Sequence, residues 1–229
     1  MFGYVSSLFD DPRSTLIFFL LAFPGRLLAI SAHEYAHAWM ADRCGDPTAR
    51  MMGRLTLNPL KHLDPMGLLM MLVFHVGWAK PVPVNMHRFK NPKRGMAVTA
   101  LAGPLSNLLI AVVFMFLYGA AYIPLGRSAV GYYFLQMIQL TAIISIGLGI
   151  FNLLPLPPLD GSKVLFSLMS DEGYYKLMRY ERYGGIVMLI LVATGVLGKP
   201  LSIAIDAVYA WLVPLAQLAC DGVFHLFYM

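Results

Sequence analysis

The sequence predicts an all-α polytopic membrane protein, with five to six transmembrane helices and a short re-entrant or β-hairpin segment at the membrane surface. Hydrophobic residues make up 59% of the 229 residues and charged residues only 13%, whereas a soluble domain carries about 25% charged residues. Apolar stretches alternate with short polar ones along the chain. The apolar stretches cover residues 14–41, 66–78, 95–123, 130–156, 184–198 and 201–219.

Most of these stretches are long enough to cross a bilayer, for which a helix needs about 20 residues. Those at 14–41, 95–123, 130–156 and 201–219 meet this length, and 184–198 meets it if the residues around Tyr183 extend it. No polar stretch is large enough to form a separate soluble domain. We therefore expect a single membrane domain over residues 1–229, with a core at 14–170 and C-terminal helices at 184–219.

The segment at 66–78 is too short to span comfortably, and basic residues flank it at 43–61 and at 80–94. Basic loops remain on the cytoplasmic side of a membrane. A segment that dips in and returns keeps both basic clusters on that side, so the dip is favoured. This predicts a multi-pass protein of the cell membrane with five spans and an outside N-terminus. Counting 66–78 as a span gives six.

The charge pattern and the cysteine content indicate which surroundings and partners to expect for the protein. The net charge of +5 comes from basic residues in the short loops between apolar stretches, a pattern that marks cytoplasmic loops and not nucleic-acid binding. The two cysteines, Cys44 and Cys220, provide no disulfide framework. The lipid bilayer is thus the expected surrounding, nucleic acid is not expected as a partner, and the sequence leaves the oligomeric state open.

Residues His33 to His37 read H-E-x-x-H inside the first apolar stretch. On a helix, positions 33 and 37 point about 40° apart and differ by about 6 Å in height, so both imidazoles can reach one ion. Glu34 points to the side, where it can act as a base on a water molecule. Ionisable groups at membrane depth are costly and indicate function. The motif predicts one zinc ion per chain.

A third protein ligand is expected, because catalytic zinc usually keeps three protein ligands and one open position. The candidates are Asp42, Asp46, His62, Asp64 and Asp160. Asp160 is favoured because it ends an apolar run broken by prolines, and broken helix at membrane depth is found where it lines a cavity or is buried in protein. In the predicted topology His37 and Asp160 also lie at similar depth.

Together these motifs resemble those of the site-2 proteases, a family of intramembrane metalloproteases. The resemblance covers residues 14–170 and is carried by the H-E-x-x-H motif, the run from Asn152 to Gly161 that matches N-x-x-P-x-P-x-L-D-G, and the G-x-x-x-N motif from Gly103 to Asn107. It implies His33, His37 and Asp160 as zinc ligands and Glu34 as the catalytic base. The chain resembles the compact form, without a PDZ or nucleotide-sensing domain.

The predicted function is that of an intramembrane zinc endopeptidase that cleaves transmembrane-helix substrates near the cytoplasmic face. Asn107 is a candidate donor to the oxyanion or to the substrate backbone, or else a contact between helices. Residues 79–86 read as an edge strand that pairs with unwound substrate, or else as an ordinary surface loop. The residues expected to bind substrate are Pro81, Val82, Pro83, Val84 and Asn85.

Two other functions fit parts of the sequence. A catalytically inactive homologue that binds membrane helices would need no base, and the intact Glu34 argues against it. A metal-dependent transporter usually has internal repeats or charged residues spread over several spans. The ionisable groups here gather at one depth, which argues against transport.

Overall fold

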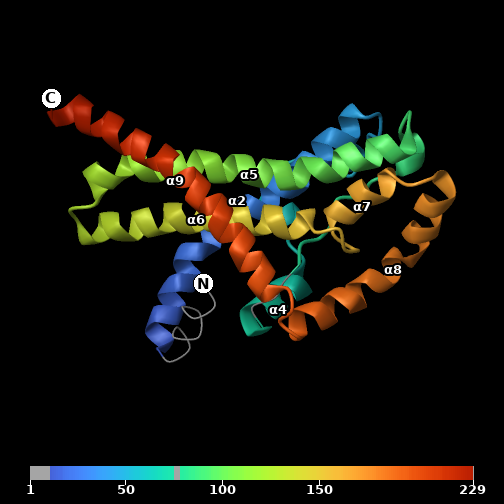
Figure 1. Cartoon of the computed structure of the whole chain (residues 1–229), viewed down its shortest axis with the longest axis horizontal. Coiled ribbons are helices and arrows are strands. Elements are labelled where there is room, and N and C mark those ends of the chain that lie inside the picture. The colour runs from blue at the N-terminus through green and yellow to red at the C-terminus, as the bar shows by residue number, and fades with distance from the viewer. Residues whose placement is uncertain (1–10, 75–77, 229) are drawn as a thin grey trace. The chain divides into compact units, whose positions relative to one another are not determined.

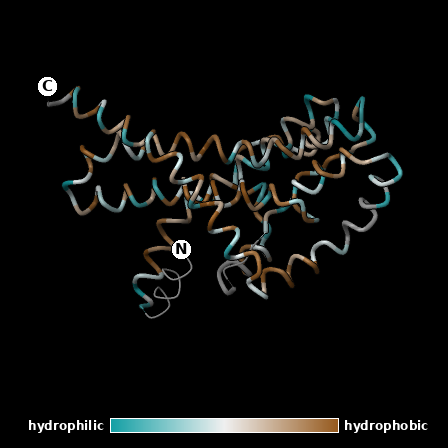
Figure 2. The backbone as a smooth tube through the Cα atoms, viewed as in Figure 1, coloured by the Kyte–Doolittle hydropathy of each residue, from teal (hydrophilic) through white to brown (hydrophobic). Residues whose placement is uncertain are grey.

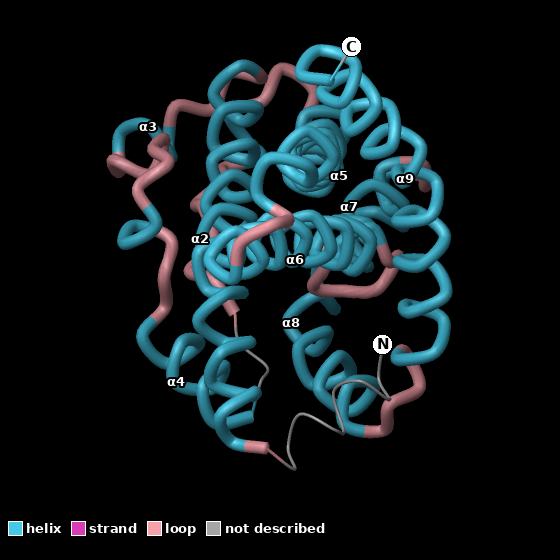
Figure 3. The backbone as a smooth tube through the Cα atoms, turned by 90° about the vertical axis from the view of Figure 1, so that its left-hand side faces the viewer, coloured by secondary structure: helices cyan, strands magenta, loops and turns pink. Residues whose placement is uncertain are grey.

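The computed structural model describes residues 11–74 and 78–228 (Figure 1). These residues are almost entirely helical, and Figure 3 shows helices joined by loops. The elements are α2 (Pro12–Arg43), α3 (Thr48–Met51), the 3-10 turn η1 (Pro59–Lys61), α4 (Pro65–Phe74), the 3-10 turn η2 (Met86–Arg88), α5 (Pro92–Leu125), α6 (Ala129–Leu153), α7 (Asp160–Ser167), α8 (Asp171–Ala193) and α9 (Gly198–Tyr228).

Four of the described helices are long and apolar enough to cross a membrane, judged by length and composition. They are α2, α5, α6 and α9, and they coincide with four of the predicted spans. Figure 2 shows apolar residues recurring along α5 and α6, with polar residues gathered in connecting loops. The polytopic all-helical fold agrees with the sequence, while the number of spans stays a prediction.

The two remaining apolar stretches form shorter helices. The stretch at 184–198 is divided between the end of α8 and a turn at Gly195, whose φ of 70° is in the left-handed region that favours glycine. Only Tyr183–Ala193 of it is apolar helix. The segment at 66–78 forms α4, whose 10 residues extend about 15 Å, half the thickness of a bilayer core. Its last part, including His75 and Gly77, lies outside the described residues.

The predicted β-hairpin is not confirmed. Among the described residues no β-strand occurs, and the segment after α4 makes an isolated antiparallel bridge between Leu63 and Ala79. The prolines at 81 and 83 explain why a ladder does not continue, since a proline has no N–H to donate. The stretch from Lys80 to Asn85 is therefore loop, held by contacts other than strand pairing.

The chain folds as two compact units. Unit 1 contains Met1–Ala29, Asn107–Ile150 and Leu191–Met229, and unit 2 contains Ile30–Ser106 and Phe151–Ile190. The helices α2, α5, α6 and α8 contribute residues to both. The expectation of a single domain over 1–229 stays a prediction.

Unit 1 is held together by an apolar core shared by α5, α6 and α9. Met115, Ile146 and Leu212 are among its buried residues. A Cβ on Gly119 would lie 1.9 Å from the carbonyl oxygen of Ala216. Small residues at such contacts allow helix backbones to approach closely, which is how apolar helices associate when lipid provides no hydrophobic driving force.

Unit 2 has a smaller apolar cluster beside its polar groups. The buried residues are Ala41, Phe89 and Met96, and Val84 and Met86 pack against them. This cluster connects the end of α2 to the start of α5 and to the loop between α4 and α5. The candidate site residues His33, Glu34, His37 and Asp160 belong to this unit, whereas Asn107 belongs to unit 1.

Candidate metal centre

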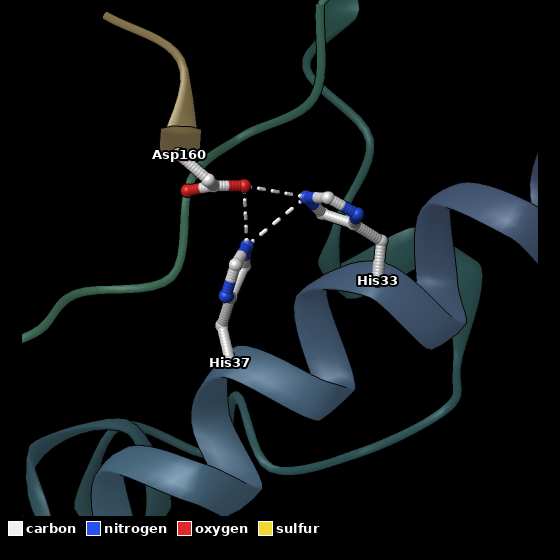
Figure 4. A group of neighbouring side chains, drawn as sticks. All are labelled: His33, His37 and Asp160. Atoms are coloured by element: carbon white, nitrogen blue, oxygen red, sulfur yellow. Dashed lines mark hydrogen bonds and ion pairs between the residues drawn. The ribbon is translucent and has the colours of Figure 1, made fainter. Parts of the chain in front are cut away.

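Three ligand-type side chains converge in unit 2. His33 and His37 extend from one face of α2, and Asp160 is the first residue of α7 (Figure 4). The Nε2 atoms of the two histidines are 3.0 Å apart, and each is 3.1 Å from Oδ2 of Asp160. All three side chains are buried. Residues separated by more than 120 positions along the chain thus meet at a single point.

The three donor atoms fit a zinc-sized ion. Tetrahedral zinc has bonds of about 2.0–2.2 Å, which separates its ligand atoms by about 3.3 Å. The observed separations of 3.0 and 3.1 Å are within a few tenths of an ångström of that spacing. Two imidazoles and a carboxylate are also donors that zinc prefers. His33, His37 and Asp160 could therefore hold the metal and leave a fourth position open.

The orientation of His37 is fixed from α5. Its Nδ1 donates to the carbonyl oxygen of Thr99 at 2.7 Å. A neutral imidazole with its proton on Nδ1 presents a lone pair on Nε2, the atom that faces His33 and Asp160. This is the usual way in which a second contact selects the tautomer of a metal-binding histidine.

Gly103 lets α5 approach the two imidazoles. A Cβ at this position would lie 2.5 Å from Cε1 and Nε2 of His37 and 2.7 Å from Cε1 of His33. Any side chain here would displace both rings. The glycine of the G-x-x-x-N motif therefore makes room for the histidines, which the sequence alone did not indicate.

Asp160 reaches the histidines because the chain folds back after α6. A Cβ on Gly161 would lie 2.2 Å from the carbonyl oxygen of Leu153, so glycine is needed where α7 begins against the end of α6. Burial raises the pKa of the Asp160 carboxyl, but the adjacent imidazoles of His33 and His37 lower it further than burial raises it. Lys163, whose Nζ is 3.6 Å from Oδ1, adds to the lowering. The pKa of Asp160 is well below its usual range, so its carboxylate is ionised.

Glu34 is buried next to the two histidines, and its Oε2 accepts a hydrogen bond of 2.9 Å from the backbone N–H of Val82. Its Oε1 accepts no hydrogen bond from the described residues. Glu34 also lines a cavity of about 440 Å³ together with His33, His37, Pro81, Val82, Val84, Met86, Met96, Thr99, Asn152, Pro158, Asp160 and Lys163. Of the predicted substrate-binding residues, Pro81, Val82 and Val84 line this cavity.

The other candidates for the third ligand have partners of their own. Asp42 pairs with Arg50 and Asp64 accepts from the N–H of Gly67. Asp42 therefore connects the end of α2 to α3, and Asp64 is used at the start of α4.

His62 and Asp46 are also engaged elsewhere. Nε2 of His62 is 2.7 Å from the carbonyl oxygen of Thr56. The carboxylate of Asp46 accepts hydrogen bonds from Thr48 and from the backbone of Asn85. Among the described residues, the only group of three metal-ligand side chains is that of His33, His37 and Asp160.

Asn107 is fully buried on α5, one helical turn after Gly103. It is not among the residues that line the cavity. Positions four apart share a helix face, so Asn107 follows Gly103 along the face that meets the histidines.

The sequence did not single out several residues that the structure brings to the site. These are Thr99, which acts through its backbone carbonyl, Lys163 and the methionines Met86 and Met96; Gly103 was noted only as part of the G-x-x-x-N motif and not for its contact with the histidines. Lys163 follows Asp160 by three positions on one helix, a spacing that could have drawn attention to it. The contact of Thr99 has no side-chain signature and leaves no signal in a single sequence.

A cluster of two histidines and an aspartate, built on apolar helices with a glutamate beside it, defines a metallopeptidase of the membrane-embedded class. Comparison with known proteins agrees. The profile described as Peptidase family M50 matches residues 122–198. A protein of Bacillus subtilis (strain 168), "Putative zinc metalloprotease YwhC", is 41% identical over 174 residues, 73% of this chain and 78% of that protein.

A second relative supports the same assignment. In Mycolicibacterium smegmatis, "Putative zinc metalloprotease Rip2" is 33% identical over 195 residues, which are 82% of this chain and 72% of that protein. No solved structure matched the chain. The chain belongs to peptidase family M50 and is a metalloprotease, which confirms the resemblance to the site-2 proteases.

Proposed function

We propose that this protein is an intramembrane zinc endopeptidase, with one zinc ion held by His33, His37 and Asp160 and with Glu34 as the base. The observation that carries the proposal is the convergence of three buried metal-ligand atoms within 3.1 Å of one another, two of them on α2, a helix apolar enough to cross a membrane. The relatives in Bacillus and Mycolicibacterium are both named as zinc metalloproteases, which supports zinc as the metal.

The chemistry is divided between the metal and Glu34. Zinc, when bound, would act as a Lewis acid that lowers the pKa of its bound water to about 7 and polarises the scissile carbonyl. The Glu34 carboxylate takes a proton from the attacking water as the new C–O bond forms. It then gives that proton to the leaving nitrogen as the C–N bond breaks. The free Oε1 is the atom available for this proton, because Oε2 is bonded to Val82.

The substrate must present an extended backbone at this site. The loop from Pro81 to Asn85 passes beside Glu34, and a substrate helix that unwinds locally can pair with it. Pro81 and Pro83 have no N–H, so at these positions the loop offers only carbonyl acceptors. The substrate strand therefore has to supply the donors. Asn107, which lies outside the cavity lining, is the candidate for stabilising the oxyanion or binding the substrate backbone, with a contact between helices as the alternative.

The membrane topology is a further part of the proposal. We place the active site toward the cytoplasm and the N-terminus outside, with five spans if α4 returns to the side it entered. Cysteines introduced at the exposed positions Arg50 and Arg88, in a chain whose native cysteines are replaced, should react with an impermeant reagent from the same side. Labelling from opposite sides would mean that α4 and its continuation cross the membrane.

The activity is tested with the purified protein in liposomes. Zinc content is measured by atomic emission, and cleavage is followed on a single-pass apolar helix with a fluorescent label at its cytoplasmic end. Wild-type protein should cleave this helix, whereas Glu34→Gln should retain zinc and lose cleavage. Glu172→Gln, at an exposed position in the first turn of α8, is the matched control and should cleave like wild type.

Three outcomes would contradict the proposal. Equal cleavage by Glu34→Gln and wild type would remove Glu34 from the mechanism. Zinc binding without cleavage of a panel of membrane helices would favour the inactive homologue. Zinc movement into sealed liposomes would favour the transporter.

A further inference from the structure

The loop from Lys80 to Asn85 is held at both ends by groups from residues 46–62. At its start, the N–H of Lys80 donates to the carbonyl oxygen of His62 at 2.8 Å, and Nη2 of Arg54 donates to the carbonyl oxygen of Lys80 at 2.6 Å. At its end, the N–H of Asn85 donates to Oδ2 of Asp46 at 2.6 Å. Between these two anchors, the N–H of Val82 donates to Glu34.

Arg54 is an unusual anchor because it is a buried cation bonded to backbone. Its relative exposure is 7%, and no carboxylate of the described residues lies within salt-bridge distance of it. A buried charge is costly unless it is hydrogen-bonded. Nη2 bonds the carbonyl oxygen of Lys80 and lies 3.4 Å from that of Pro81. Its charge is therefore directed at the loop backbone.

The backbone around Arg54 is arranged for this contact. Gly53 has a φ of 65°, in the left-handed region, and the N–H of Arg54 then bonds back to the carbonyl oxygen of Ala49 at 2.8 Å. Asp46, at the other anchor, is fully buried and also accepts from the N–H of Thr48 at 3.1 Å. Both anchors are therefore fixed before they reach the loop.

We propose that Arg54 is a positioning residue for peptide hydrolysis, which it serves by holding the Val82 N–H on Oε2 of Glu34. This proposal depends on the proposed function, in which Glu34 is the base. A carboxylate with one oxygen on a fixed donor cannot rotate freely, so its second oxygen faces the cavity. The loop that meets the substrate is then also the element that orients the base.

Correct orientation is worth a measurable factor in rate. A misplacement of about 1 Å in a catalytic group can cost about 100-fold in rate. Without the Val82 N–H, Glu34 still lines the cavity from α2. The plane of its carboxylate is then no longer fixed by a hydrogen-bond donor. The expected effect is on kcat, because substrate contacts of the loop remain.

The first test removes the donor and keeps the rest of the loop. Val82→Pro deletes the N–H in a loop in which positions 81 and 83 are already proline. Val82→Ala is its matched control, because it loses the same side chain but keeps the N–H. We expect kcat of Val82→Pro to fall at least about tenfold further than that of Val82→Ala, with equal zinc content. Equal kcat for the two variants would overturn the proposal.

The second test connects Arg54 to this donor. Arg54→Met should lower kcat about as much as Val82→Pro, Arg54→Lys should lose less, and Arg50→Met, at an exposed position four residues earlier, should behave like wild type. In the Val82→Pro background, Arg54→Met should have little further effect, because both act through one contact. Losses that multiply in the double variant would show that Arg54 acts elsewhere.

A third measurement does not depend on cleavage. Between Lys80 and Asn85 only Lys80, Val82, Val84 and Asn85 have an amide proton, so hydrogen exchange there is simple to assign. The Val82 amide should be protected in wild type and exchange faster in Arg54→Met and in Glu34→Ala. Fast exchange of the Val82 amide in wild type would contradict the positioning role of Arg54, even if the protein cleaves its substrate. A protected Val82 amide in a protein that cleaves no substrate would instead contradict the proposed peptidase function.

If Arg54→Met does not fold, the single variants Arg54→Lys and Val82→Pro test whether Arg54 positions Glu34. A lysine can bond one carbonyl where the arginine reaches two, so an intermediate kcat and intermediate exchange of the Val82 amide are expected. Wild-type kcat in both Arg54→Lys and Val82→Pro, together with wild-type exchange of the Val82 amide in Arg54→Lys, would reject Arg54 as a positioning residue.

Discussion

Replacement of Gly103 by alanine is the sharpest test of how α5 supports the metal centre. The new Cβ would lie 2.5 Å from Cε1 and Nε2 of His37, whereas ordinary contact begins at 3.4 Å, so the ring or the helix has to move by about 0.9 Å. Metal–ligand distances tolerate about ±0.2 Å. The displacement is several times this tolerance, and it affects both histidines.

The expected result is a loss of zinc affinity larger than the loss of fold stability. Disturbing a group that orients a metal ligand typically costs 10–100-fold in affinity, or about 1.4–2.7 kcal/mol. Overpacking costs about 1–3 kcal/mol, but alanine regains about 1 kcal/mol over glycine inside a helix. The net change in unfolding free energy should therefore be small, while zinc binds more weakly.

Zinc affinity is measured by competition with a chromogenic chelator, and stability by thermal unfolding in detergent. Gly147→Ala is the matched control, since its Cβ would be in ordinary contact with Ile205 at 3.5 Å. It should bind zinc normally and unfold at the same or a higher temperature. Wild-type zinc affinity in Gly103→Ala would refute the reasoning, because the rings would then not be held by this contact.

Three further predictions concern single residues. Asp160→Asn should weaken zinc binding by more than about 100-fold, beyond the range for an orienting contact, while Asp171→Asn at an exposed position should not; equal affinities would exclude Asp160 as a ligand. His62→Ala should keep full zinc content but lower the unfolding temperature, at a cost of about 1–3 kcal/mol for the buried hydrogen bond; loss of zinc would return it to the list of ligands. Gly119→Ala should destabilise unit 1 by about 1–3 kcal/mol through its clash with Ala216, and an unchanged unfolding temperature would show that α5 and α9 separate freely.

The sequence predicted much of the metal centre because its signals are local. Helical spacing was enough to place His33 and His37 on one face, and the proline-rich break favoured Asp160 over four other candidates. The ends of α2, α5 and α6 and the start of α9 lie within three residues of the predicted apolar stretches, whereas α9 continues to Tyr228, nine residues beyond its predicted end. Each of these features depends on residues that are close together in the sequence.

Other features depend on contacts between distant residues and could not be predicted. The bond from His37 to Thr99 involves a backbone carbonyl, and the role of Gly103 is visible only when the imidazoles lie against it. The stretch at 184–198 was expected to be one helix because its hydropathy is continuous, but a left-handed turn at Gly195 divides it. Glycine is common within membrane helices, so its presence gave no warning of a turn.

The two prolines beside the metal centre have a consequence for the crowded bilayer. An exposed extended segment has unpaired backbone N–H and C=O groups that can pair with the same segment of a second molecule, and such pairing leads to aggregation. At Pro81 and Pro83 two such copies would bring acceptor against acceptor, with no proton to share. The segment from Pro81 to Pro83 is therefore poorly suited to pairing with the same segment of a second molecule.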